Sequence, residues 1–263
     1  MTPTIFMIHG MWCGPWCWEN YRNVLEGRGY RCLTPTLRYH DADPQSPPDP
    51  RLGSTGLLDY VADLEQEIRQ LESKPIIIGH SLGGLLAQIL AARGLARATV
   101  LLTPAAPAGI LALTPSVVKS FWSVQSRWGF WRQPMRLSLA EAAYAIFNLL
   151  TPEEQQAAYA RMVYESGRVA AQLGYWFLTS APASRVDEKK VTCPLLVVAG
   201  KQDRITPASV VQRIARKYQP GATYREFANQ AHWVLGQPGW QEVANYVANW
   251  LDEQNNIAPG VGG

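Results

Sequence analysis

With 263 residues, the chain has room for one large domain with an insertion, whereas two unrelated domains would be a tight fit. Apolar residues make up 47% of the chain and charged residues 17%, below the roughly 25% of an average globular protein, so a sizeable core is expected and general disorder is excluded. The formal net charge of +3, from 24 Lys and Arg against 21 Asp and Glu with no dense basic block, argues against nucleic acid as a partner.

Short apolar runs alternate with amphipathic segments in the first part of the chain, which predicts βα units around a parallel sheet. Residues 75–78, Pro-Ile-Ile-Ile, form an apolar run too short for a helix, so they predict a buried central strand. Leucine, isoleucine and valine recur at helical spacing between Leu57 and Leu71. The expected strands are 4–8, 30–33, 75–78 and 99–102, and the expected helices are 18–26, 57–71 and 82–93.

The last part of the chain repeats this alternation. Strands are expected at 195–199 and 223–227, with helices at 208–218 and 240–251. The sequence therefore predicts an α/β fold with a mostly parallel six-stranded sheet flanked by helices. Its core would comprise residues 1–103 and 188–252, and the Gly- and Pro-containing residues 253–263 would form a flexible C-terminal tail.

An interruption at residues 104–187, between the fourth and fifth expected strands, shows no convincing strand pattern and is rich in aromatic residues. Because a structureless loop of that length is uncommon in a compact domain, we expect a helical lid there. The aromatic side chains predict an apolar wall for a substrate pocket. The candidate pocket residues are Trp12, Trp122, Trp128, Trp131, Trp176 and Trp233.

The N-terminus and the cysteines bear on location and metal binding. Met1–Thr4 lack the basic and long apolar segments of a secretory signal, and no apolar run reaches the about 18 residues of a membrane span. A cytoplasmic protein without a membrane span is expected. The four cysteines have no C-x-x-C spacing and few histidines near them, so they predict buried free thiols and no metal site.

Residues 79–83, Gly-His-Ser-Leu-Gly, match the pattern G-x-S-x-G between an expected strand and an expected helix. A sharp strand-to-helix turn needs small neighbours, which Gly79 and Gly83 supply, so that the Ser81 hydroxyl projects from the sheet edge. The helix N-terminus behind Ser81 also directs free N–H groups at developing negative charge. The pattern predicts that Ser81 is a nucleophile rather than a helix cap.

A serine nucleophile needs a base, and only four histidines are available. His9 and His80 lie in turn motifs. His40 lies beside Asp41 and Asp43 in Pro-rich surroundings, and we interpret this group as a solvated loop rather than a metal cluster. His232 follows the last expected strand and is therefore the favoured base.

The carboxylate that orients the base should follow another strand. Asp203 comes directly after the expected strand 195–199, while the residues after strand 99–102 contain no acid. A helix-capping role ahead of Pro207 is the alternative for Asp203. The resulting chain order of Ser81, Asp203 and His232 differs from the orders in chymotrypsin and subtilisin.

With these motifs, nearly the whole chain resembles an α/β-hydrolase. The resemblance implies that the residue after the His9-Gly10 turn and the residue after the nucleophile donate backbone N–H groups to an oxyanion, which gives Met11 and Leu82. Residues 9–18, His-Gly-Met-Trp-Cys-Gly-Pro-Trp-Cys-Trp, are further similar to the branch that contains plant methylesterases and hydroxynitrile lyases.

Departures within that branch favour hydrolysis. The lyases have a lysine directly after the base histidine and a threonine in the His-Gly turn, whereas this chain has Trp233 and Gly10. Haloalkane dehalogenases and epoxide hydrolases use an aspartate where this chain has Ser81, so they are excluded.

The resemblance implies a carboxylesterase-type serine hydrolase that acts through an acyl-enzyme on small to medium apolar esters, with no metal or organic cofactor. Strongly anionic substrates are disfavoured by the low charge. Alternatives that use the same triad are a lactonase, a thioesterase, a lysophospholipase and a C–C hydrolase. A lyase-like enzyme and a small-ligand receptor on this fold also stay open, as do a monomeric and a homodimeric state.

Overall fold

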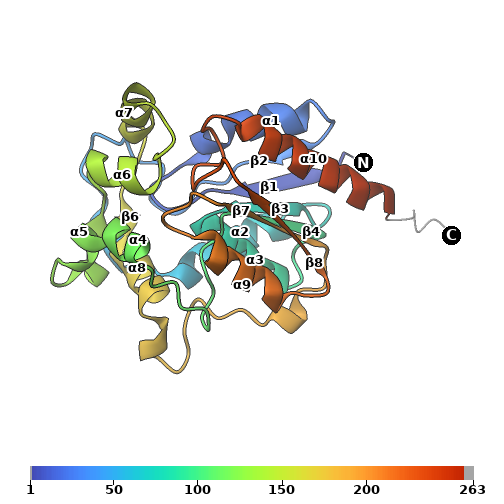
Figure 1. The fold of residues 1–263 in the computed structure, drawn as a ribbon. Helices are drawn as coiled ribbons and strands as arrows, with labels where there is room; N and C mark the ends of the chain where they lie inside the picture. Colours follow the sequence, from blue (N-terminus) through green and yellow to red (C-terminus); the bar gives the residue numbers. More distant parts are fainter. Residues whose placement is uncertain (1, 258–263) are drawn as a thin grey trace.

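A computed structural model describes residues 2–257, and its centre is one six-stranded sheet (Figure 1). The strand order is β2-β1-β3-β4-β7-β8, and every neighbouring pair is parallel. The predicted six-stranded, mostly parallel sheet is therefore confirmed. The strands are β1 (Thr4–Ile8), β2 (Arg31–Leu33), β3 (Ile76–His80), β4 (Ala98–Leu102), β7 (Leu195–Gly200) and β8 (Ala222–Phe227).

The burial of each strand follows its place in the sheet. Every residue of β3 and β4 is buried, because these central strands have helices on both faces. In register, Ile77 pairs with Phe6 on one side and with Thr99 on the other. The edge strand β8 instead exposes Thr223 and Arg225, which fits one solvated side.

Helices cover both faces of the sheet: α1 and α10 lie on one, and α2, α3 and α9 on the other (Figure 1). The predicted apolar stripe of α2 buries Leu57, Val61, Leu64 and Ile68, whereas Leu58 is 48% exposed. The helix α3, which follows Ser81, is buried along nearly its whole length. The bounds are α1 (Glu19–Glu26), α2 (Leu57–Arg69), α3 (Leu82–Ala92), α9 (Ala208–Lys217) and α10 (Trp240–Ile257).

The insertion between β4 and β7 consists mainly of short helices. They are α4 (Pro115–Ser120), α5 (Trp122–Gln125), α6 (Leu139–Ala145), α7 (Pro152–Ala160) and α8 (Gly167–Gly174), with 3-10 turns at Phe130–Arg132 and Trp176–Leu178. Four of these helices begin at a Ser or Thr cap, namely Thr114, Ser138, Thr151 and Ser166. In Figure 1 the insertion occupies one end of the molecule, beside the carboxyl ends of the strands.

Strand structure within the insertion was not predicted. The antiparallel pair β5 (Pro134–Met135) and β6 (Glu165–Ser166) forms a second, two-stranded sheet. Two-residue strands leave no periodic pattern in the sequence, and this pair depends on a close approach of backbone at Gly167, where a Cβ would lie 1.8 Å from the Phe130 carbonyl oxygen.

The C-terminal tail was predicted to begin at residue 253, and this was wrong for residues 253–257. Helix α10 continues to Ile257. The Tyr30 hydroxyl donates to Asp252 at 2.8 Å and accepts from the Asn255 amide at 2.7 Å, so contacts to the core hold the last turns. Residues 258–263 lie outside the described part of the chain.

The expectation of a solvated loop around His40 was also wrong. The His40 ring is buried, and its Nε2 lies 3.1 Å from Glu165 Oε2 on β6. Glu165 also accepts from the Tyr60 hydroxyl at 2.8 Å and from the Ser166 amide at 2.6 Å. Burial lowers the pKa of His40, but the Glu165 carboxylate more than offsets this, so the pKa is raised. This buried group joins the core to the insertion, whereas Asp41 is exposed.

The pKa of His9 shifts in the opposite direction to that of His40. Burial, followed by the nearby His40 ring, lowers the pKa of His9 to about 3, so the folded protein holds it neutral. Its Nδ1 lies 2.9 Å from the Gly10 carbonyl oxygen, and its Nε2 accepts from the Leu37 amide at 3.2 Å. The ring therefore holds the turn that precedes Met11, as its place in a turn motif predicted.

A pH dependence of stability follows from His9. The unfolded chain binds a proton at His9 below pH about 6.5 and the folded protein does not, so acidification from neutrality costs up to about 1.4 kcal/mol per pH unit. We expect the free energy of unfolding, measured in urea at neutral and mildly acid pH, to fall more in the wild type than in His9→Gln, which retains an acceptor for Leu37. Equal losses in the two proteins would contradict this.

Candidate active site

Ser81 lies in a strained turn between β3 and α3. Its backbone has φ 53° and ψ −117°, a conformation that L residues rarely adopt. The Ser81 amide donates to the Leu102 carbonyl oxygen at 3.0 Å, and the Ser81 carbonyl oxygen accepts from Ala105 at 2.8 Å. These bonds to the next strand and its loop hold the turn at the carboxyl edge of the sheet.

The two glycines of the motif are needed because backbone segments approach each other closely. A Cβ at Gly79 would lie 2.1 Å from the Gly83 carbonyl oxygen, and a Cβ at Gly83 would lie 2.1 Å from the Ile8 carbonyl oxygen. Neither distance is compatible with a side chain without a backbone shift. The close packing of β1, β3 and α3 thus explains why glycine stands at both ends of the G-x-S-x-G pattern.

The structure brings the three predicted side chains into one hydrogen-bonded chain. His232 Nε2 lies 3.0 Å from Ser81 Oγ, and His232 Nδ1 lies 2.8 Å from Asp203 Oδ2. Asp203 is on the loop after β7 and His232 on the loop after β8, so parallel strands deliver all three groups to one edge. The exposed fraction of each of these residues is 8% or less, which keeps the interactions largely out of water.

The Asp203 carboxylate has further donors in its own turn. Oδ1 accepts from the Ile205 and Thr206 amides, both at 2.8 Å, and Oδ2 lies 2.8 Å from Thr206 Oγ1. Asp203 therefore both stabilises the turn before α9 and contacts His232. Thr206 was not predicted as a site residue, although an Asp followed by Thr at i+3 is a turn pattern that the sequence displays.

His80, the variable residue before Ser81, positions the loop that bears the base. Its Nε2 lies 2.9 Å from the His232 carbonyl oxygen. Because a carbonyl oxygen can only accept a hydrogen bond, His80 Nε2 carries the proton and donates it to this bond. Burial, followed by proximity to His232, lowers the pKa of His80 to about 3, so the ring is neutral. A neutral donor here fixes His232 without placing a second positive charge beside it.

Met11 and Leu82, the two predicted oxyanion donors, lie close to Ser81. Leu82 is the first residue of α3, where an N–H has no partner inside the helix. Within residues 2–257, neither amide has a backbone or side-chain acceptor. Both residues line the cavity that contains Ser81.

That cavity has a volume of about 100 Å³ and a mostly aliphatic wall. The predicted pocket residue Trp176 lines it, and Trp12 lines a smaller adjoining cavity of about 20 Å³ beside His232. The remaining wall includes residues of the insertion that were not predicted: Ile110, Leu111, Leu113, Val117, Phe121 and Leu173.

The structure places the other four predicted tryptophans outside the Ser81 cavity and the small cavity that adjoins it. Trp122 and Trp128 are 66% and 90% exposed. Trp131 lines a separate groove. The Trp233 ring packs against His80 and Phe147, with centroids 5.9 and 5.2 Å away, and so supports the site from behind. Which face of a short helix turns inward depends on its packing, and the aromatic composition could not predict it.

One cysteine, Cys13, lines the small cavity beside His232. All four cysteines are free thiols; Cys13, Cys17 and Cys32 are buried and Cys193 is partly buried. The part of the chain that the structure describes contains no group of three or more His, Cys, Asp or Glu residues arranged to hold a metal ion.

Comparison with known proteins assigns the family. Residues 5–245 match the profile of the alpha/beta hydrolase family, so the chain belongs to that family, as its motifs predicted. No protein of curated function matches the sequence significantly.

Solved structures share the fold. A methylesterase from Arabidopsis superposes with a TM-score of 0.71 at 13% identity, over 95% of this chain and 99% of that one. A monoacylglycerol lipase from Paleococcus ferrophilus gives 0.70 at 22% identity, over 96% of each chain. A polyneuridine aldehyde esterase gives 0.70 at 15% identity, over 96% of this chain and 100% of that one. At these identities the likeness concerns the fold.

No helix within residues 2–257 is long and apolar enough to cross a membrane.

Proposed function

We propose that the protein is a serine hydrolase that cleaves carboxylic esters through an acyl-enzyme. The observation that carries this proposal is the chain of contacts from Ser81 Oγ to His232 Nε2 at 3.0 Å and from His232 Nδ1 to Asp203 Oδ2 at 2.8 Å. A nucleophile, a base and a carboxylate in these positions are what acyl transfer to serine requires. Esterases and a lipase among the proteins of similar fold support it.

The reaction proceeds in two halves. His232 Nε2 accepts the Ser81 hydroxyl proton as Oγ bonds to the ester carbonyl carbon, and the Met11 and Leu82 amides hold the resulting oxyanion. The tetrahedral intermediate then expels the alcohol, which takes the proton from His232. Water attacks the acyl-enzyme in the same manner, giving up a proton to His232, and the carboxylic acid leaves as Ser81 regains its hydrogen. Asp203 orients the imidazole and stabilises its cation.

The cavity favours small to medium apolar groups next to the reacting carbonyl. Its volume of about 100 Å³ lies below the roughly 300 to 1,000 Å³ of a site that encloses a drug-sized ligand. Residues such as Leu113, Val117 and Phe121 of the insertion supply much of its wall. We therefore assign residues 104–187 the role of a lid over the core formed by 1–103 and 188–252, and a small-molecule ester as substrate.

A series of p-nitrophenyl esters tests this proposal. We expect the acetate and butanoate to be hydrolysed with kcat/KM at least about ten-fold above a hydroxylated or charged ester of equal length, because burying an unpaired polar group in this cavity costs about 1–3 kcal/mol. Release of p-nitrophenolate measures the rate. Equal turnover of the short polar and the short apolar esters, or no turnover of any ester by folded protein, would contradict the substrate assignment.

A further inference from the structure

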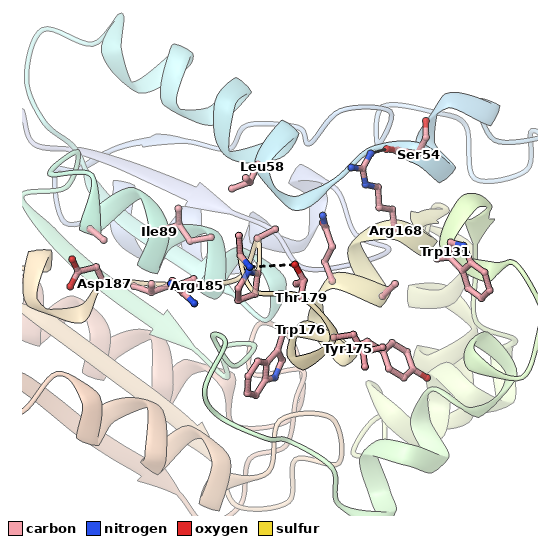
Figure 2. A pocket seen from close by; sticks show the side chains of 18 of the residues that line it. Ser54, Leu58, Ile89, Trp131, Arg168, Tyr175, Trp176, Thr179, Arg185 and Asp187 are labelled. Atoms are coloured by element: carbon pink, nitrogen blue, oxygen red, sulfur yellow. Dashed lines mark hydrogen bonds between the residues drawn. The ribbon is translucent and has the colours of Figure 1, made fainter.

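A second, larger hollow lies next to the Ser81 cavity. This groove has a volume of about 1170 Å³ and runs between the core and the insertion (Figure 2). Leu58 of α2 and Ile89 of α3 line it from the core, and Trp131, Tyr175 and Trp176 line it from the insertion. Nothing in the reaction described above uses it.

Helix α8 and Trp176 form the partition between the groove and the Ser81 cavity. Ala170, Leu173 and Gly174 line the cavity, at the spacing of one helix face, while Ala171 and Gln172 line the groove. Trp176 lines both spaces. Trp176 is the residue that the two linings share, so its bulky indole stands directly between the two spaces.

The Trp176 ring has few polar restraints. Among residues 2–257, its indole N–H makes no side-chain hydrogen bond of the kind that holds Trp12, whose Nε1 donates to the Met135 carbonyl oxygen at 3.1 Å. Trp176 begins a 3-10 turn and is partly exposed. A rotation of this ring would therefore break no hydrogen bond.

The groove combines apolar side chains with positive charge. Arg168 and Arg185 donate to the carbonyl oxygens of Ser54 and Ser180, and neither they nor Arg132 form an ion pair within the described chain. By contrast, Lys190 lies 3.8 Å from Asp187, the only carboxylate among the groove residues that the structure describes. An apolar groove with unneutralised guanidinium groups suits an amphiphile with an anionic end.

We propose that the groove is the distal compartment of the substrate site, and that Trp176 determines how much of an ester can reach it. A substrate would place its ester group at Ser81 and pass an apolar chain beyond Trp176 into the groove, with a terminal carboxylate or phosphate at the arginines. This proposal rests on the proposed esterase function. It extends that function, because the Ser81 cavity of about 100 Å³ is then only the first part of the binding site.

The test compares chain lengths in matched variants. The substrates are p-nitrophenyl butanoate, octanoate and dodecanoate, with the p-nitrophenyl monoesters of the corresponding dicarboxylic acids. Trp176→Ala should raise kcat/KM for the dodecanoate relative to the butanoate by about ten-fold or more, since each chain segment newly accommodated adds transition-state binding. Trp122→Ala removes the same side chain from the insertion at a position that is 66% exposed and lines neither the groove nor the Ser81 cavity, and it should leave this ratio within about two-fold of the wild type.

The charged substrates test the arginines. In the wild type at low salt, the dodecanedioate monoester should react with a higher kcat/KM than the neutral dodecanoate, and this preference should fall with added NaCl and in Arg185→Gln. An unchanged dodecanoate to butanoate ratio in Trp176→Ala, or the same change in Trp122→Ala, would overturn the assignment of Trp176. If kcat/KM for the dodecanedioate monoester were no higher than for the neutral dodecanoate, the inference that the substrate has an anionic end would be wrong.

Two controls separate a failure of the groove proposal from misfolding of the variant and from a failure of the esterase function. If Trp176→Ala does not fold, Trp176→Leu removes most of the ring while it retains apolar bulk, and the same ratio is measured. Hydrolysis of the butanoate that requires Ser81 shows that the esterase function holds even where the groove proposal fails. Absence of that hydrolysis would overturn the esterase function itself.

Discussion

Replacing Ser81 by alanine is expected to lower kcat for ester hydrolysis by roughly four to six orders of magnitude, the loss that triad removal causes in other serine hydrolases. The substitution deletes the oxygen that lies 3.0 Å from His232 Nε2 and that would form the acyl bond. It leaves the space around the turn unchanged, because alanine retains the Cβ of serine. Initial rates with p-nitrophenyl butanoate measure the loss, and thermal unfolding confirms that the variant is folded.

Ser120→Ala is the matched control for that experiment. Ser120 is also buried, and its hydroxyl donates to the Ser116 carbonyl oxygen at 2.8 Å within α4. Its loss should cost about 1 kcal/mol of stability and leave kcat within about two-fold. A Ser81→Ala protein with near-normal turnover would show that another residue is the nucleophile.

Replacing Asp203 by asparagine is expected to lower kcat by about 10⁴-fold, because the amide no longer selects the imidazole tautomer in which Nδ1 carries the proton. In the wild type, Asp203 Oδ2 lies 2.8 Å from that nitrogen. Asparagine can still accept from the Ile205 and Thr206 amides, so the turn before α9 should persist. Rate and melting temperature are measured on the same preparation.

The comparison with Asp49→Asn separates catalysis from turn stabilisation. Asp49 caps the 3-10 turn at Pro50–Ser54 and accepts from the Arg51 amide at 2.8 Å, far from Ser81 in the sequence and without contact to a histidine. A capping aspartate contributes about 1 kcal/mol and little rate. If Asp203→Asn lost stability and kept its rate, as a cap would, Asp203 would not be the orienting carboxylate.

The core of the fold could be predicted because local patterns and position determine it. The run 75–78 is apolar on both faces, and Ser81, Asp203 and His232 follow strand ends that a parallel sheet brings to one edge. The choice of catalytic residues was limited further, because the chain has only four histidines and the residues after the expected strand 99–102 contain no acid.

The parts that could not be predicted depend on contacts between distant residues. His40 is buried because Glu165, 125 residues later, lies against it, and no local pattern links the two. The cavity wall consists of aliphatic residues such as Leu113 and Val117 rather than the exposed Trp122 and Trp128, because helix packing selects the inward face. The aromatic composition indicated an apolar wall and included Trp176, but it could not identify the aliphatic residues that form most of the wall.

Covalent labelling shows whether Ser81 is the nucleophile. The protein is treated with diisopropyl fluorophosphate, which phosphorylates activated serines, and the residual esterase activity and the modified peptide are followed together by rate assay and mass spectrometry. We expect one label per chain, on Ser81, with activity lost in proportion to labelling, and no label on Ser81→Ala. Full activity after treatment, or inactivation with the label on another residue, would contradict it.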